Sequence, residues 1–257
     1  MIELIDLKKK FGDRWITRGV DLHIPDGQMT CIVGRSGEGK SVLLKQIMGL
    51  IKPTSGNIII NGVNILTADE LSVKSILKKC GYVFQFAALF DSLTVFENVA
   101  LALTQTECEP DADKIRAAVM EKLALVNLEQ DVMDKYPCEL SGGMRKRVGI
   151  ARSLINNPSI ILYDEPTTGL DPINARIVHE LMHAMQKKGN VTSVVVSHDT
   201  EIFRYADNVA LLHEGQIKFF GNAQAVWESD NSYVYQFIRG LNDGPIQTDD
   251  RPRIESE

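Results

Sequence analysis

Several short segments of the chain carry residue types that can bind and cleave a phosphate chain. One of them, GRSGEGKS from Gly34 to Ser41, fits the pattern G-x-x-x-x-G-K-[ST]. Its glycines permit backbone angles that direct successive N–H groups at an anion, and a helix that follows would add its positive N-terminal end. Lys40 supplies a positive charge for the β- and γ-phosphates, and the Ser41 hydroxyl is placed to ligate Mg²⁺. The alternative is an ordinary glycine-rich turn, which the expected strand before it and helix after it argue against.

Two further candidate groups follow short apolar runs. Asp164 and Glu165 end the run SIILYDEP, and His198 ends the run VVVSHD. A parallel sheet presents its ligand crevice at the carboxyl ends of its strands, so these side chains would reach one crevice. We expect Asp164 to complete the Mg²⁺ shell and Glu165 to polarise the attacking water. His198 would donate to the γ-phosphate or hold that water. A solvated acidic turn and a hydrogen-bonded surface histidine are the alternatives.

These residues need a sheet with helices around it, and the sequence indicates one. MTCIVG, SIILY and TSVVV are short, apolar and β-rich, which is typical of buried strands. SVLLKQIMGL has apolar residues at helical spacing and ends near Gly49 and Pro53. Strands that alternate with helices predict a mostly parallel α/β sheet. Further strands are expected at residues 2–8 and 19–24, at NIII and near 80–84, with helices at 172–188 and 200–205 and a hairpin through NVALLHEGQIKFF.

The middle and the end of the chain depart from this α/β pattern. From about 86 to 156 the helical patterns TVFENVALAL, ADKIRAAVMEKLALV and GGMRKRVGIARSLI dominate, which predicts a helical subdomain inserted in the core. The segment SGG opens the third helix, ahead of three basic residues, so its N-terminus is a candidate anion site. We expect a main domain over residues 1–228 and an extension over 229–257, whose end TDDRPRIESE is polar and partly disordered.

Composition excludes several classes of protein. The chain has 257 residues, 44% of them hydrophobic, and a net charge of -6, which leaves no domain-wide basic field for nucleic acid. No run approaches the ~18 to 20 apolar residues that span a bilayer, and the start MIELIDLKKKFGDRW is not a secretory signal. The four cysteines are scattered without a CxxC pair, which indicates neither a zinc knuckle nor a disulfide framework. Cys31, in an apolar run, is expected to be buried, and the chain to be cytosolic.

Taken together, the motifs resemble those of one family. GRSGEGKS, the glutamine of YVFQF, LSGGMRKR, IILYDEP, TTGLDP and SHD occur in the order found in ABC ATPases. The most specific of them is LSGG, Leu140 to Gly143, because a phosphate loop alone is shared by many classes of NTPase. The resemblance covers nearly all of residues 1–228. It implies a P-loop NTPase core with an antiparallel β part at the N-terminus, and an ATPase that uses ATP and Mg²⁺ to drive a transporter.

The resemblance also implies roles for single residues. Phe11 resembles the aromatic that stacks on adenine, and Gln85 the glutamine that touches Mg²⁺ and the water and senses the membrane subunit. Ser141 and Gly143 resemble the contacts to a γ-phosphate held by the other protomer, which implies two head-to-tail copies that sandwich two ATP molecules. Asp171 resembles the acid that crosses the dimer interface, although TGLD stands where many members have SALD. The implied catalytic set is Glu165, His198 and Gln85, the implied Mg²⁺ set is Ser41, Gln85 and Asp164, and the implied ATP contacts are Phe11, Gly34, Arg35, Ser36, Gly37, Glu38, Gly39, Lys40, Ser41, Ser141, Gly142, Gly143 and Asp171.

Two segments resemble a narrower group, the Mla-type lipid-transport ATPases that work with MCE-domain proteins. ALFDSLTVFENVA, residues 88–100, follows Gln85 and could line the groove for a membrane-subunit helix; packing inside the helical subdomain is the alternative. SYVYQFIRGLNDGP resembles the stretch that in this group reaches across the ATPase dimer, and packing on its own domain is the alternative. The resemblance implies phospholipid transport at the cytoplasmic face of the inner membrane, with permease subunits and an MCE-type partner.

Three other functions remain open at this stage. HELMH, His179 to His183, matches the zinc-peptidase pattern H-E-x-x-H, but we expect both histidines to point away from the helix's apolar face, and no third ligand is evident. An ABC ATPase of a cell-division or iron–sulfur assembly system would carry the same motifs. A regulatory ATP-binding module without turnover is the third, and Glu165, Gln85 and His198 together argue against it.

Overall fold

The computed structural model describes residues 1–104 and 111–247. Cys108 and the stretch TDDRPRIESE, expected to be partly disordered, lie outside the described residues. In the described part of the chain the cysteines Cys31, Cys80 and Cys138 are free thiols. Cys31 is fully buried, as its apolar run predicts, and burial raises the pKa of its thiol.

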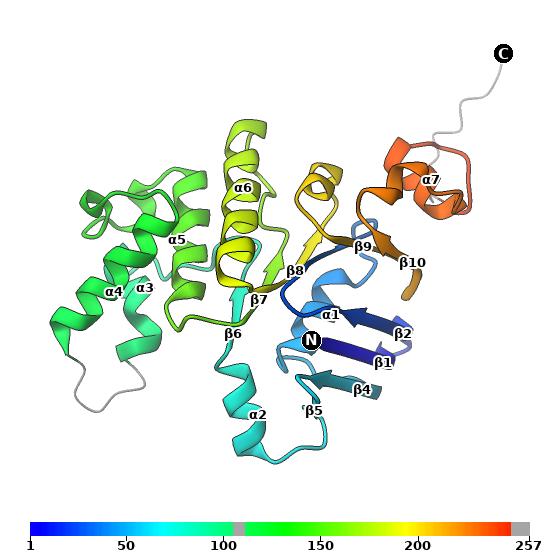
Figure 1. Ribbon diagram of the computed structural model, residues 1–257, viewed down its shortest axis with the longest axis horizontal. Coiled ribbons are helices and arrows are strands. Elements are labelled where there is room, and N and C mark those ends of the chain that lie inside the picture. Colours follow the sequence, from blue (N-terminus) through cyan, green and yellow to red (C-terminus); the bar gives the residue numbers. More distant parts are fainter. Residues whose placement is uncertain (105–110, 248–257) are drawn as a thin grey trace.

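A six-stranded sheet with the order β10-β9-β3-β8-β7-β6 forms the core (Figure 1). Five strands run parallel, which confirms the predicted mostly parallel sheet, and β10 pairs antiparallel with β9 at one edge. The carboxyl ends of the five parallel strands therefore meet at one edge. The strands are β3 (Met29–Val33), β6 (Cys80–Val83), β7 (Ile160–Asp164), β8 (Thr192–Ser197), β9 (Asn208–His213) and β10 (Gln216–Asn222).

A second, antiparallel sheet has the order β2-β1-β4-β5 and confirms the antiparallel part expected at the N-terminus. Its strands are β1 (Ile2–Phe11), β2 (Arg14–Ile24), β4 (Ser55–Ile60) and β5 (Val63–Asn64). The β1–β2 hairpin extends further than the expected 2–8 and 19–24, because bulges in its register let pairing continue to the turn at Gly12. The two-residue strand β5 was not anticipated.

Alternate residues of the central strands face two apolar layers. On β3, Cys31 and Val33 join the layer that contains residues of α5 (Gly142–Leu154) and α6 (Pro172–Gly189). Ile32 joins the opposite layer, with Leu43 and Leu44 of α1 (Lys40–Ile47) and residues of the antiparallel sheet. Because both faces are covered, the strands are apolar throughout, as is usual for parallel sheets.

Three helices stand between β6 and β7, as the helical patterns predict: α3 (Val95–Thr104), α4 (Ala112–Leu125) and α5. They form the green group beside α6 in Figure 1 and pack through an apolar interior. Ser141 caps α5 by accepting a hydrogen bond from the Met144 amide, and Asp171 caps α6 by accepting from Ile173 and Asn174. The exact subdomain boundaries at 86 and 156 stay a prediction.

Two helices of the structure lie outside the helices that the sequence predicts. Helix α2 (Glu70–Leu77) was not foreseen, since none of its residues is buried and its main local signal is the Asp69 cap on Ser72. Helix α7 (Ser232–Arg239) packs on its own chain through Tyr233, Phe237 and Ile238. The described part of the extension thus covers its own domain, and a crossing to a second protomer stays a prediction.

None of the helices within residues 1–104 and 111–247 has the length and apolar character needed to cross a bilayer.

The buried side chain of Asn98 bonds to several backbone groups of the loop after β6, which gives a stability prediction. Asn98 accepts from the Phe90 amide at 2.8 Å and donates to the carbonyls of Phe90, Leu93 and Thr94 at 3.0–3.1 Å. Asn98→Ala removes the acceptor of the Phe90 amide and the side-chain donor of the Leu93 carbonyl, whereas the Phe90 and Thr94 carbonyls keep backbone donors. It should therefore lower the free energy of unfolding by about 2 kcal/mol in urea denaturation. Arg116→Ala, on the exposed face of α4, is the control and should stay within ~0.5 kcal/mol of the parent. An equal, small effect of both changes would contradict this structural role.

Candidate active site

The phosphate loop, residues 34–41, joins the end of β3 to the start of α1 and lies at the carboxyl edge of the sheet. Glycine is needed at two of its positions. Gly34 lies so close to the Leu212 carbonyl that a Cβ atom would collide with it. Gly39 has φ +94°, and a Cβ there would lie 2.5 Å from Ile16 Cγ2. These two glycines therefore let the loop pack closely against β9 and β2.

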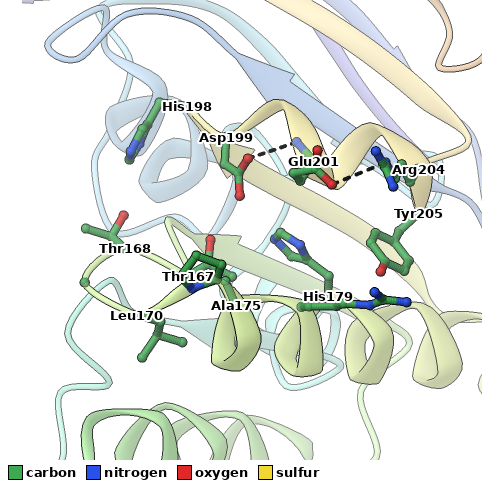
Figure 2. A pocket seen from close by; sticks show the side chains of 13 residues that line it. Thr167, Thr168, Leu170, Ala175, His179, His198, Asp199, Glu201, Arg204 and Tyr205 are labelled. Atoms are coloured by element: carbon green, nitrogen blue, oxygen red, sulfur yellow. Dashed lines mark hydrogen bonds and ion pairs between the residues drawn. The ribbon is translucent and has the colours of Figure 1, made fainter.

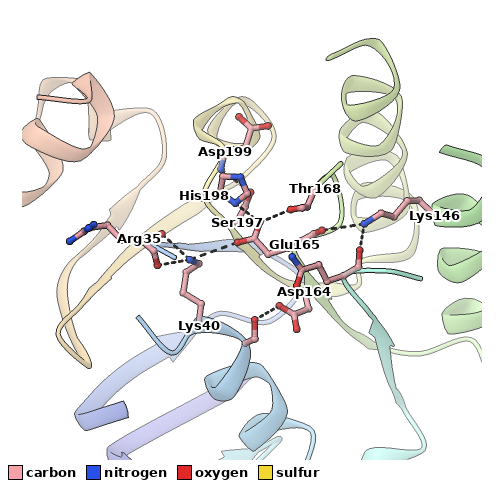
Figure 3. A network of polar contacts seen from close by, with 12 residues as sticks. Arg35, Lys40, Lys146, Asp164, Glu165, Thr168, Ser197, His198 and Asp199 are labelled. Carbon is pink, nitrogen blue, oxygen red and sulfur yellow. Dashed lines mark hydrogen bonds and ion pairs between the residues drawn. The ribbon is translucent and has the colours of Figure 1, made fainter. Parts of the chain in front are cut away.

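Lys40 is the positive charge of the loop. Its ammonium group donates to the carbonyls of Gly34 and Arg35 at 2.8 and 2.9 Å, and lies 3.7 Å from Glu165 Oε1 (Figure 3). Its side chain is 5% exposed. Burial lowers its pKa, and the carboxylates of Glu165, Glu38 and Asp164 oppose that shift.

Asp164 lies opposite the loop at the end of β7. It accepts from the Ser41 hydroxyl at 2.6 Å through Oδ1 and from the Tyr82 hydroxyl at 2.9 Å through Oδ2. Burial and the neighbouring carboxylate raise the pKa of Tyr82, so the phenol stays a neutral donor. A hydroxyl beside a carboxylate is the kind of hard oxygen set that Mg²⁺ prefers, so these residues fit the expected ion.

Glu165 has an unusual backbone and a well-fixed side chain. Its φ of 48° is in the left-handed region, where a non-glycine residue is strained. The carboxylate accepts from His198 Nδ1 at 2.7 Å and from the Thr168 hydroxyl at 3.1 Å (Figure 3). Glu165 and His198 thus lie in contact at the carboxyl edge of the sheet, where the sequence predicts that they meet. Both bonds are to Oε2, which leaves Oε1 directed toward the Lys40 ammonium, 3.7 Å away.

Lys146 is a site residue that the sequence reasoning missed. Its ammonium group donates to the Gln85 carbonyl and, at 3.5 Å, to the Glu165 carbonyl. Burial lowers the pKa of Lys146, and Glu165 and Asp164 act against that shift. All three basic residues after SGG donate to backbone carbonyls of their own chain, Arg145 to Leu140 and Arg147 to Asn127. The anion site expected at the start of α5 stays a prediction.

Helix α5 also holds the turn that follows Gln85. Arg152 donates to the carbonyls of Ala87 and Ala88, both at 2.7 Å. These two residues have φ of 61° and 49°, and Gly149 leaves room for Ala87 against the helix. Gln85 is therefore attached to α5, and no local sequence pattern could reveal this because the contacts span more than 60 residues.

Other predicted site residues lie outside this cluster. Within residues 1–104 and 111–247, no hydrogen bond or ion pair joins residues 141–143 to the phosphate loop. Asp171 bonds only within its own cap region, where Asn174 and backbone amides lower its pKa. Phe11 is 47% exposed, with the Lys9 ammonium 4.6 Å from its ring. One chain thus brings Lys40, Ser41, Asp164, Glu165 and His198 together, and Phe11, Ser141 and Asp171 lie outside this cluster.

A cavity of about 780 Å³ adjoins His198 between α6 and the short helix η3 (Thr200–Arg204) (Figure 2). His179 lines it and is only 2% exposed, so this histidine is covered by its own chain, whereas we expect from the sequence that it faces away from the apolar core, toward solvent or a partner. Tyr205 covers that side of α6, with its ring 5.6 Å from His179, and its carbonyl lies 3.0 Å from His183 Nδ1. Burial lowers the pKa of His179. In the described ranges no three His, Cys, Asp or Glu side chains are grouped to hold a metal ion, so nothing supports the zinc-peptidase alternative.

Comparison with known proteins agrees with this arrangement. A family model described as ABC transporter matches residues 17–168. The probable ribonucleotide transport ATP-binding protein mkl of Mycobacterium tuberculosis is 40% identical over 246 residues, which are 95% of this chain and 68% of that protein. The intermembrane phospholipid transport system ATP-binding protein MlaF of Escherichia coli is 36% identical over 247 residues, covering 96% of this chain and 91% of that protein.

A solved structure shows the same likeness in three dimensions. It is the dimeric structure of a post-hydrolysis state of an ATP-binding cassette bound to ADP and Pi. It superimposes with a TM-score of 0.79 at 33% identity, covering 87% of this chain and 99% of that chain.

The position of Lys146 gives a prediction about turnover. Lys146→Met keeps the length of the buried side chain but removes the ammonium donor of the Gln85 carbonyl, and leaves the Glu165 carbonyl with the Thr168 amide alone. We expect kcat for nucleotide hydrolysis to fall roughly tenfold while KM changes less than about threefold, since neither carbonyl holds the phosphates. Steady-state kinetics measure both constants.

Two controls separate this role from general damage. Lys146→Arg keeps a donor and should restore most of kcat, and Lys188→Met, at an exposed position of α6, should leave both constants unchanged. Parental kcat in Lys146→Met would show that the contact plays no part in turnover.

Proposed function

The chain belongs to the ABC transporter family as an ATP-binding subunit that hydrolyses ATP to drive transport, and we propose that the cargo is phospholipid. We further propose that it works with membrane-spanning permease subunits and an MCE-type protein. It would then lie on the cytoplasmic face of the inner membrane.

One observation carries the catalytic part of the proposal: the approach of Lys40, Ser41, Asp164, Glu165 and His198 at one edge of the sheet. Lys40 and the loop amides would hold the β- and γ-phosphates, and Ser41, Asp164 and Gln85 would hold Mg²⁺. When bound, Mg²⁺ would neutralise charge on the phosphates. Glu165 would accept the proton of the attacking water, and His198 would orient Glu165 and donate to the γ-phosphate.

The other half of each site is proposed to come from a second copy of the chain. Support comes from the separation of residues 141–143 from the phosphate loop within one chain, and from the dimeric state of the cassette at 33% identity. Ser141, Gly142 and Gly143 would contact the γ-phosphate bound by the partner at the N-terminus of α5. Phe11 would stack on adenine, and Asp171 would lie at the interface.

The remaining proposals concern the contact with the membrane complex. Phe86 and Phe90, 80% and 52% exposed, lie beside Gln85 and would meet a permease helix together with residues 88–100. Residues 1–228 would form the ATPase unit, with a helical subdomain at 86–156, and 229–257 the extension.

Phospholipid is preferred as cargo because MlaF, named for phospholipid transport, matches over 91% of its length. The tail stretch SYVYQFIRGLNDGP points the same way. The name of mkl gives ribonucleotide transport, at slightly higher identity over 68% of that protein, so ribonucleotide is an outcome that the test must distinguish.

The assigned water-activating role predicts the behaviour of Glu165→Gln. The amide cannot accept the proton, so turnover should fall by about 100-fold or more while ATP binding persists. Turnover is measured by phosphate release, and retained ATP by extraction from the purified dimer. Glu180→Gln, an exposed glutamate on α6, is the matched control and should behave as the parent. Turnover at the parental rate in Glu165→Gln would refute the role, and would also favour a different base.

The cargo proposal predicts what the ATPase responds to in its membrane complex. The tagged chain is purified from native membranes with its partners and placed in phospholipid nanodiscs. Phospholipid of the right headgroup should raise ATP turnover severalfold, and membrane-spanning subunits with an MCE-type protein should co-purify. Stimulation by ribonucleotides instead would contradict the proposal. So would recovery with soluble assembly factors, which is expected for a cell-division or iron–sulfur system.

A further inference from the structure

The outer side of the phosphate loop is held by the C-terminal part of the same chain. Glu38 is a variable position of the loop motif, and its side chain turns away from Lys40 toward the β9–β10 turn. Its Oε1 lies 2.9 Å from His213 Nδ1, and its Oε2 accepts from the Glu214 amide at 2.6 Å. The Glu38 and His213 side chains are 13% and 8% exposed, so this contact is well shielded from water.

The turn that receives Glu38 is itself fixed. Glu214 and Gly215 both have positive φ, as a tight hairpin turn requires. The Gly215 carbonyl accepts from the Arg18 amide of β2 at 2.8 Å, which ties the turn to the antiparallel sheet. The Leu212 carbonyl, just before the turn, lies against Gly34.

Helix α7 supports the other side of His213. The Tyr233 ring lies 5.6 Å from the His213 ring, and the Lys218 ammonium of β10 lies 5.7 Å from the Tyr233 ring. Tyr235, on the opposite side of the helix, is 44% exposed and pairs with Arg239 instead. Only one face of α7 is therefore connected to the loop.

The segment after α7 reaches the loop directly. Arg35 donates to the Gln247 carbonyl at 2.7 Å. Residues 241–246 are held to α7 by the buried Gln236, which donates to the carbonyls of Leu241 and Ile246 and accepts from the Ile246 amide at 2.7 Å. Two variable positions of GRSGEGKS thus contact later parts of the same chain: Glu38 contacts the β9–β10 turn, and Arg35 contacts the segment after α7.

We propose that α7 and residues 240–247 brace the phosphate loop of their own chain, through His213 on Glu38 and through Gln247 on Arg35, and so set its affinity for nucleotide. This inference rests on the assignment of residues 34–41 as the ATP site. The brace keeps the loop in its binding conformation before nucleotide arrives, so that less conformational entropy is lost on binding. His213, Tyr233 and Gln236 act through the loop and are positioning residues.

The test compares variants of the full chain that differ in which face of α7 they alter. His213→Ala and Tyr233→Ala remove the support of Glu38, Gln236→Ala releases residues 241–246, and Tyr235→Ala is the matched control. The Kd of ATP and of ADP is measured by calorimetry, and KM and kcat by phosphate release. We expect His213→Ala to weaken both nucleotides roughly tenfold, or about 1.4 kcal/mol, with KM rising more than kcat falls.

Tyr233→Ala and Gln236→Ala should weaken binding about threefold, and Tyr235→Ala should leave Kd unchanged. Parental Kd in His213→Ala and Tyr233→Ala, with melting temperatures showing folded protein, would overturn the proposal. An equal loss in Tyr235→Ala would also overturn it, since general destabilisation would then explain the effect. Lys40→Ala distinguishes failure of the ATP-site assignment from failure of the brace. If Lys40→Ala binds ATP as the parent does, the assignment of the ATP site is wrong. If it loses binding while the His213 and Tyr233 variants keep the parental Kd, only the proposed brace is wrong.

Discussion

Burial of charge at one edge of a parallel sheet is the constraint on which the rest of the structure depends. Lys40 and Glu165 keep only 5% and 11% of their side chains exposed, and an ion buried in this way is costly unless it is paired and hydrogen-bonded. The Lys40 ammonium donates to two carbonyls of the loop that follows β3. Glu165, which follows β7, accepts from Thr168 in the same segment and from His198, which follows β8. The sheet must therefore keep β3, β7 and β8 adjacent, with their carboxyl ends level.

Two parts of the chain hold this charged cluster from outside. On one side two residues of α5 donate hydrogen bonds to the site. Lys146 donates to the carbonyls of Gln85 and Glu165, and Arg152 donates to those of residues 87 and 88. Gln85 and Glu165 are therefore both bonded to α5. On the other side His213 of β9 contacts Glu38 of the phosphate loop, and the Gln247 carbonyl accepts from Arg35 of that loop.

The sequence predicted best the features whose causes are local. The strand, loop and helix around residues 34–41 and the acids at the end of β7 follow from short patterns, and the structure has them in place. Helix α2 was missed because it is short and buries none of its residues fully; only Val73 and Ile76 pack in part against the core. His179 was misplaced because Tyr205 covers its side of α6, and Lys146 and Tyr82 were missed because their partners are 61 to 82 residues away. Such contacts depend on tertiary packing, which a single sequence does not display.

The most direct test of the central claim, that residues 34–41 of one protomer and residues 141–143 of its partner enclose one ATP, mixes two defective chains. In a Glu165→Gln background one chain carries Lys40→Ala and the other Ser141→Arg, so that only a mixed dimer contains one intact site. Sedimentation velocity with Mg-ATP should show each chain alone as a monomer and the mixture as a heterodimer. The claim is contradicted if the mixture stays monomeric while the Glu165→Gln parent dimerises, or if the Ser141→Arg chain dimerises alone as readily as that parent.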